Sequence, residues 1–242
     1  GKSLSYWVAA FSAQATGESA WLLLGVTGMG AMLGFSAYWI VIGEAVGVFV
    51  AWFFMAPRFK YLTDKYDSIT VIDYLVSRFG SKSHLLRIIS AVALSFFVLI
   101  YISAQIDATG SAFESFLQWD YHAGALMGFI IVAGYCIAGG FLAAAWTDMF
   151  QGAVMLLCLL VLPIVAGLSV ENFDNIYTEL ETIDPGLVSI WGAGGINTLN
   201  VSIVLGMALI GLGFLGSPQV FARLIAIKNE TEIRRGRWVA LV

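Results

Sequence analysis

Charged side chains are scarce in this chain of 242 residues. Asp, Glu, Lys and Arg together make up 12% of the sequence, about half of their share in an ordinary soluble domain. Hydrophobic residues make up 60%, and the mean hydropathy is +0.87. This composition excludes an ordinary soluble domain and indicates a membrane protein. The 26 glycines are spread through apolar segments, where they suit close helix packing in lipid.

Cysteines and the common motifs of catalysis are also nearly absent. The two cysteines, Cys136 and Cys158, lie inside apolar runs, so neither a disulfide framework nor a metal site is expected. The sequence has no phosphate-binding glycine loop, no nucleophile elbow and no cluster of metal ligands. Its basic residues are too dispersed to bind nucleic acid and are expected to serve topology and anionic lipid. We therefore expect no enzyme and no cofactor.

Six apolar stretches are long enough to cross a bilayer, which takes about 20 residues. We predict that Pro57 ends the second of them. A tight hairpin at Thr147 and Asp148 is predicted to separate the fourth from the fifth, with one of these two side chains capping the following helix. Short amphipathic helices are predicted at about 70–80 and 218–227. The six predicted spans are about 7–33, 36–56, 86–117, 124–146, 149–169 and 200–217.

The basic residues all fall on one side of this layout. The loops on that side hold or adjoin all 12 Lys and Arg residues, whereas the loops on the other side carry acidic residues and no Lys or Arg. The first set is 1–6, 57–86, 147–148 and 218–237, and the second is 34–36, 118–123 and 170–199. Because positive charge marks cytoplasmic loops, we predict a multi-pass protein of the cell membrane whose basic loops are cytoplasmic. Both ends of the sequence suggest a piece of a larger protein.

A polar, glycine-containing gap at 12–20 interrupts the first apolar run. Inside a bilayer, unpaired backbone groups and a carboxylate cost several kcal/mol each, roughly. A membrane helix interrupted in this way exposes carbonyl and amide groups that can hold an ion or a small solute. Glu18 lies in the gap. It either contributes to such a site or faces a water-filled cavity and caps the second half-helix, and the two interpretations are compatible.

Other intramembrane polar residues have structural interpretations when they are taken alone. Glu44 in the second span is interpreted as hydrogen-bonded to a neighbouring helix. Tyr101 and Gln105 lie one turn apart on a face of the third span, where their residue types favour interhelical hydrogen bonds over a wall that faces a solute. Glycines and Pro218 interrupt the sixth span. A second discontinuous helix that matches the first indicates a solute site between two repeats.

Several motifs together resemble the solute:sodium symporter family, in particular its sodium/proline symporters. The motifs are Gly139–Gln151, Gly213–Arg223, Ser12–Trp21, Tyr101 and Phe113–Glu114. The resemblance covers essentially the whole chain. It implies an all-α integral membrane protein with part of a leucine-transporter-type inverted-repeat fold, in which the first and sixth of about six transmembrane helices are interrupted. It assigns 1–169 to the first five-helix repeat, 170–199 to an external loop and 200–242 to the start of the second repeat.

The resemblance also implies a set of site residues. Sodium would be the coupling ion, bound by backbone carbonyls at Ala15 and Glu18, with the remaining ligands on a later helix that this chain does not contain. The implied substrate-binding residues are Tyr101, Gln105, Ile210, Phe214 and Pro218. Phe214 stands where the family usually has a tyrosine, and Ile210 where it usually has a tryptophan. Gly17 replaces a family aspartate, and we hypothesise that Glu18 restores the lost negative charge.

The predicted function is sodium-coupled symport of a small organic solute, proline or a related amino acid, by alternating access. The expected partners are the solute, sodium and membrane lipid. Two alternatives remain open: a membrane sensor domain derived from a symporter, and symport of a solute that is not an amino acid. A channel is disfavoured, because the sequence has no charged ring or filter motif.

Overall fold

The computed structural model describes residues 2–17, 19–80, 84–169 and 173–241, and within them it contains helices and their connections but no strand. Four of its helical runs are long and apolar enough to cross a membrane. These runs are Leu24–Lys65, Leu85–Leu117, Tyr121–Leu168 and Thr198–Gly216. The predicted all-α membrane fold is therefore confirmed.

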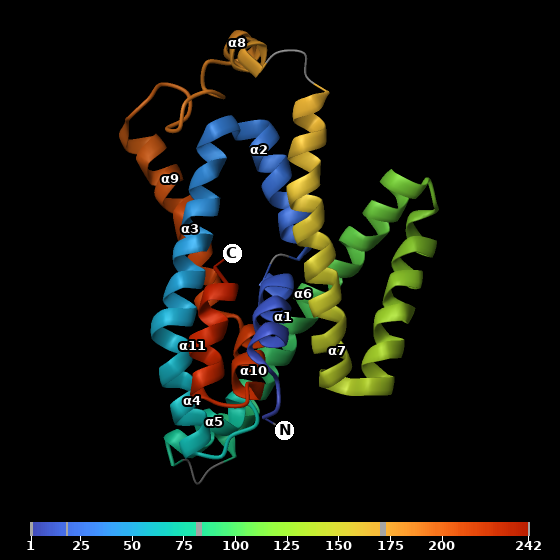
Figure 1. Cartoon of the computed structure of the whole chain (residues 1–242), viewed down its shortest axis with the longest axis vertical. Coiled ribbons are helices and arrows are strands. Elements are labelled where there is room, and N and C mark those ends of the chain that lie inside the picture. Colours follow the sequence, from blue (N-terminus) through green and yellow to red (C-terminus); the bar gives the residue numbers. More distant parts are fainter. Residues whose placement is uncertain (1, 18, 81–83, 170–172, 242) are drawn as a thin grey trace.

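Two of these runs reverse direction at a glycine with positive φ. Gly34 has a φ of 57° and Gly140 a φ of 59°, a region that residues with a side chain rarely adopt. Gly34 lies between α2 (Thr27–Leu33) and α3 (Tyr38–Val50), which run in opposite directions in Figure 1. Gly140 divides α7 (Tyr121–Leu168) into two arms, which Figure 1 shows in yellow-green and yellow. Each of these two runs is therefore a pair of helical segments that run in opposite directions.

The hairpin predicted at Thr147 and Asp148 is wrong, because the chain reverses earlier, at Gly140. Both residues lie within the second arm of α7. The Thr147 hydroxyl donates hydrogen bonds to the carbonyls of Ala143 and Ala144 in the preceding turn, so neither Thr147 nor Asp148 caps a helix start. The reversal requires a backbone conformation that glycine adopts without strain and that Thr or Asp does not.

The second helix does not end at Pro57, contrary to the prediction. After α3 the chain passes through the π-helical turn η3 (Ala51–Met55) and continues as α4 (Ala56–Lys65), with Pro57 in the first turn of α4. A proline in a helix removes one hydrogen bond and its ring crowds the preceding turn. The wider π-helical turn before Pro57 accommodates this defect without ending the helix.

Both predicted interruptions are present. The helix α1 (Tyr6–Gly17) ends in the polar gap, and helical structure resumes with the π-helical turn η1 (Trp21–Val26), which leads into α2. The helix α9 (Thr198–Ile210) tightens into the 3-10 helix η4 (Gly211–Gly216). Ser217 then adopts an extended conformation before α10 begins. The other elements are η2 (Gly34–Ala37), α5 (Val71–Arg78), α6 (Leu85–Leu117), α8 (Phe173–Ile183), α10 (Pro218–Ala226) and α11 (Glu230–Val239).

The larger hydrophobic cluster lies at the end of the molecule that holds the N-terminus. It joins α1 to the end of α3, α4, α10 and α11 around the buried Trp52, and α1, α4, α10 and α11 lie in the lower half of Figure 1. The N-terminal segment is fixed there by backbone hydrogen bonds, from the Leu4 N–H to the Ala226 carbonyl and from the Lys228 N–H to the Leu4 carbonyl. The buried Lys60 ammonium donates to the Ile225 carbonyl at 3.2 Å.

A second, smaller cluster lies between α3 and α9. Its buried members are Ile40, Val204 and Met207. The Trp39 ring packs against Trp191 of the segment that follows α8, with the ring centroids 5.6 Å apart. This segment and α8 lie at the end of the molecule opposite the N-terminus (Figure 1). Each end of the molecule therefore has its own core.

The backbones of α3 and the α9–η4 segment approach each other closely at three glycines. A Cβ atom placed on Gly43 would lie 2.1 Å from the Ala208 carbonyl oxygen, and one on Gly47 would lie 2.0 Å from that of Gly211. A Cβ atom on Gly211 would in turn lie 1.9 Å from the Gly43 carbonyl oxygen. Gly43 and Gly47 are four residues apart, the spacing at which small residues let membrane helices meet.

Candidate functional site

The interruption of α1 lies against α6, which carries Tyr101 and Gln105. The Tyr101 hydroxyl donates a hydrogen bond to the Thr16 carbonyl oxygen at 3.3 Å. One turn further along α6, the Gln105 side-chain oxygen accepts one from the Ala20 N–H at 3.1 Å. The two side chains therefore bind backbone groups on either side of the interruption. The helical spacing in the sequence predicts that Tyr101 and Gln105 share one face of α6. It does not predict that their hydrogen-bond partners are backbone groups.

Phe214 meets the same interruption from the other discontinuous segment. It is buried within η4, and a Cβ atom placed on Gly17 would lie 2.7 Å from the Phe214 ring. Only a glycine at position 17 lets the ring come this close to α1. The interruptions of α1 and of α9 therefore face each other, with Tyr101 and Gln105 of α6 beside them.

The end of α1 offers the carbonyl groups that a cation site needs. The last four carbonyls of a helix have no partner within it. Of those at the end of α1, the Thr16 carbonyl accepts from Tyr101. Ala15 lies one residue earlier and lines a groove beside α1. Carbonyl oxygens suit a hard cation such as sodium, so the chemistry at Ala15 fits the predicted role. Glu18 lies outside the described residues, and its predicted roles stay predictions.

The other two predicted site residues flank η4. Ile210 is the last residue of α9, and 39% of its surface is exposed. Pro218 is the first residue of α10, a position where its fixed φ suits a helix start. Their roles in substrate binding likewise stay predictions.

A polar cluster of Ser12, Asp148 and Arg223 is the feature of this region that the sequence analysis missed. The Arg223 guanidinium forms an ion pair with the Asp148 carboxylate at 2.5 Å and also donates to the Ser12 hydroxyl at 2.5 Å. The Ser12 hydroxyl donates to Asp148 at 2.7 Å. Ser12 is fully buried, and the side chains of Arg223 and Asp148 are 11% and 17% exposed. The cluster ties α1, α7 and α10 together.

No local signal in the sequence predicts this cluster, because its members are far apart along the chain. The only hint was that Asp148 and Arg223 both lie in the motifs that carried the family resemblance. The sequence instead predicts that Asp148 or Thr147 caps a helix. A buried ion pair across three helices makes it a tertiary contact, since breaking such a pair leaves an uncompensated charge.

Comparison with known proteins finds a family match over the whole chain. The sequence pattern of the Sodium:solute symporter family matches residues 1–242. The chain is 35% identical over its whole length to the high-affinity proline transporter PutP of Bacillus subtilis and covers 50% of that protein. It is 33% identical to the osmoregulated proline transporter OpuE of the same organism, of which it covers 48%.

A third relative, the sodium/proline symporter of Staphylococcus aureus, is 30% identical over 247 aligned positions, which cover the whole of this chain and 47% of the relative. The chain therefore spans about half the length of the curated relatives that it matches. The apolar helices and the family match also agree on a multi-pass membrane protein. The chain belongs to the sodium:solute symporter family.

Proposed function

We propose that a transporter of the relatives' full length that contains this chain, called the full-length transporter below, moves a small solute together with sodium. The solute is proline or a related amino acid. The observation that carries the proposal is the arrangement at the α1 interruption, where Tyr101 and Gln105 bind backbone groups on either side of it and Phe214 packs against Gly17. The names of the relatives, which are proline transporters or symporters, support this choice of solute.

In this proposal the carbonyl groups of Ala15 and Glu18 supply part of a sodium site, and the other ligands come from the half of the transporter beyond this chain. Tyr101, Gln105, Ile210, Phe214 and Pro218 form one wall of the solute site. Sodium binding favours a conformation open to the outside, and solute binding then permits closure. The chain corresponds to a first repeat over 1–169, an external loop over 170–199 and the start of a second repeat over 200–242.

We further propose that the end of the molecule with the N-terminus, α4 and α5 faces the cytoplasm. Lys2 and Lys60 both form ion pairs with Asp64 at this end. The acidic helix α8 lies at the opposite end (Figure 1). This distribution of charge follows the rule that basic segments stay on the cytoplasmic side.

Uptake by the full-length transporter in proteoliposomes tests the proposed function. We expect proline, or a related amino acid in a screen of labelled amino acids and other small organic solutes, to accumulate when sodium is present outside. Replacing sodium by choline removes the coupling ion and should abolish accumulation. Solute binding without sodium-driven accumulation would favour the sensor alternative instead. Accumulation of a solute of another class would overturn the assignment of an amino acid.

Tyr101→Phe tests whether the hydrogen bond to the Thr16 carbonyl supports the site. The substitution removes a bond worth about 1 kcal/mol, so we expect the KM for solute or sodium to rise about fivefold while the melting temperature stays nearly unchanged. Tyr38→Phe is the matched control, because the Tyr38 hydroxyl is exposed and makes no hydrogen bond within the described residues. Equal kinetics of the two variants would argue against a role for Tyr101.

A further inference from the structure

Arg237 on α11 lies over two aromatic rings. Its guanidinium carbon is 4.7 Å from the centroid of the Phe53 ring of η3 and 5.4 Å from that of the Trp238 ring. The two rings meet edge to face, with their centroids 5.2 Å apart. A guanidinium over aromatic faces gains cation–π attraction, and its planar N–H groups are held in a fixed direction. The rings therefore position this charge at the contact between α11 and η3.

The charge of Arg237 has no counter-ion in the part of the chain that the structure describes. Its Nε–H group is buried and donates no hydrogen bond there. The other arginines of α11 do have acidic neighbours. Arg234 pairs with Glu230 at 2.8 Å, and Arg235 lies 3.9 Å from Glu232. An arginine keeps its charge in proteins, and a buried donor without an acceptor is costly, so Arg237 lacks an anionic ligand.

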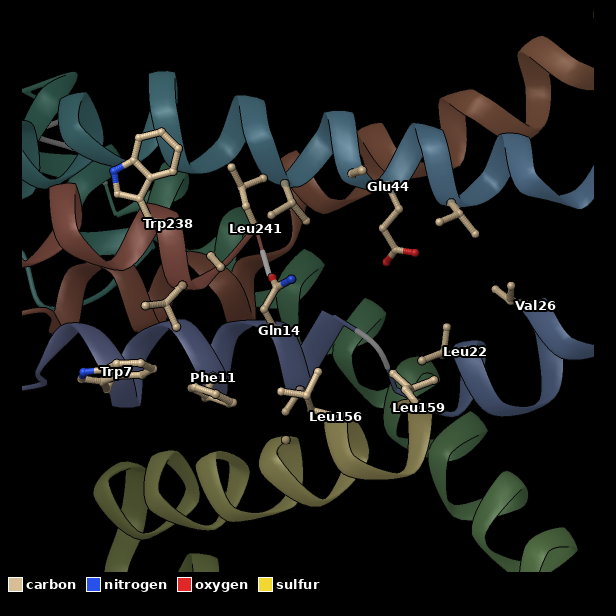
Figure 2. A pocket seen from close by; sticks show the side chains of 17 residues that line it. Trp7, Phe11, Gln14, Leu22, Val26, Glu44, Leu156, Leu159, Trp238 and Leu241 are labelled. Atoms are coloured by element: carbon tan, nitrogen blue, oxygen red, sulfur yellow. The ribbon is translucent and has the colours of Figure 1, made fainter. Parts of the chain in front are cut away.

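Exposed aromatic side chains surround this position. Trp238 is 60% exposed, and Phe54 of η3 is 56% exposed. Figure 2 shows Trp238 of α11 and Trp7 of α1 at the same end of the groove beside α1. This end of the molecule holds the N-terminus and is the one proposed to face the cytoplasm. Because tryptophan is enriched where hydrocarbon meets the lipid headgroups, we expect Arg237 to lie at the depth of the cytoplasmic headgroups.

An anionic phospholipid matches both properties of this position. Its phosphate can accept two parallel hydrogen bonds from one guanidinium, and its acyl chains cover exposed aromatic side chains. Arg58 on α4 is also exposed and has no partner within the described residues, so it adds to the attraction of anionic headgroups. A soluble anion would bind the charge but leave Phe54 and Trp238 in water.

We propose that Arg237 binds the phosphate of an anionic phospholipid in the cytoplasmic leaflet around the full-length transporter. The Nη groups donate hydrogen bonds to the phosphate oxygens, while Phe53 and Trp238 hold the guanidinium in place. The site lies on α11, which is tied to the start of α1 by the hydrogen bond from the Tyr6 N–H to the Glu232 carboxylate. The bound lipid therefore stabilises the cytoplasmic end of the molecule. This proposal depends on the proposed orientation and holds whichever solute is carried.

Native mass spectrometry of the purified full-length transporter tests the binding. The probes are phosphatidylglycerol and phosphatidylcholine with identical acyl chains, which differ in headgroup charge. We expect the first phosphatidylglycerol to bind about fivefold more tightly or better, and Arg237→Gln to lower its affinity by about the same factor. Arg235→Gln is the matched control, because Arg235 lies on the same helix and is 65% exposed. It should change the affinity by less than about twofold.

Several outcomes would overturn the proposal. Equal affinities for the two lipids, or an unchanged affinity in Arg237→Gln, would mean that Arg237 does not bind the headgroup. Displacement of the lipid by millimolar inorganic phosphate would mean that the site takes a soluble anion. A lower melting temperature of lipid-free Arg237→Gln with unchanged lipid binding would mean that an acidic side chain elsewhere in the transporter is the partner.

Chemical modification of the unmodified transporter decides the question if Arg237→Gln does not fold. Phenylglyoxal reacts with accessible guanidinium groups, and peptide mapping gives the rate at each arginine. Relative to phosphatidylcholine, phosphatidylglycerol is expected to slow the reaction of Arg237 about fivefold or more and to leave that of Arg235 unchanged. Equal rates at Arg237 in the two lipids would refute the proposal. Neither experiment measures transport, so the outcome is independent of the proposed function.

Discussion

Arg223→Met in the full-length transporter is expected to lower the free energy of unfolding by about 3 kcal/mol or more. The substitution keeps much of the side-chain volume but leaves the Asp148 carboxylate, which is 17% exposed, with the Ser12 hydroxyl as its one remaining hydrogen-bond partner among the described residues. Removal of one member of a buried ion pair is costly because the remaining charge stays desolvated. Thermal unfolding in detergent measures the loss. Uptake corrected for the amount of folded protein should fall as well, since the cluster positions α1 against α10.

Arg234→Met is the matched control for this substitution. Arg234 pairs with Glu230 one turn away on α11, and its side chain is 66% exposed. Exposed pairs contribute roughly 0–1 kcal/mol, so the control should remain close to the unmodified protein. Adding Asp148→Leu to Arg223→Met removes the stranded charge and should restore part of the lost stability. Equal effects of Arg223→Met and Arg234→Met would show that the buried cluster contributes no more to stability than an exposed ion pair.

Gly43→Ala is expected to be the other severe substitution, with a loss of about 3 kcal/mol. Its added methyl group would lie 2.1 Å from the Ala208 carbonyl oxygen, so α3 and α9 would have to separate. Overpacking of this kind costs about 1–3 kcal/mol or more, and here the obstacle is backbone that has no rotamer to change. The melting temperature and the yield of folded protein after extraction measure the effect.

Gly206→Ala supplies the same chemical change without the collision. Gly206 lies on α9, in the same helix pair, and within the described structure no atom outside its own stretch of helix lies within 4 Å of where its Cβ would be. Alanine favours helix over glycine by about 1 kcal/mol, so this variant should be as stable as the unmodified protein or slightly more stable. A similar loss in both variants would indicate that the close approach to Ala208 is not the reason for the loss at position 43.

Much of the fold follows from properties that are local in the sequence. The apolar run that forms α6, the amphipathic patterns of α5 and α10, and the polar gap after α1 each depend on residues that are neighbours along the chain. Hydropathy and helical spacing are enough to find such elements. The convergence of Tyr101 and Gln105 could be predicted for the same reason, since residues four apart share a helix face.

The errors and omissions concern features that depend on backbone conformation or on distant parts of the chain. Thr147 and Asp148 are polar, and polarity suggested the turn, but the reversal at Gly140 is decided by a positive φ. Pro57 is tolerated because the turn before it widens. The ion pair of Asp148 with Arg223 joins residues 75 positions apart. The pattern of a single sequence does not indicate which residues so far apart along the chain meet in the fold.

The separate cores at the two ends have a mechanical consequence. The larger cluster around Trp52, which includes Phe214 beside the α1 interruption, and the smaller one around Ile40 share no residue. Bending of the chain at the interruptions of α1 and α9 would therefore change the contacts of one end while the other end keeps its packing. Substitutions within one core are therefore expected to weaken the packing of that end and to leave the packing of the other end intact.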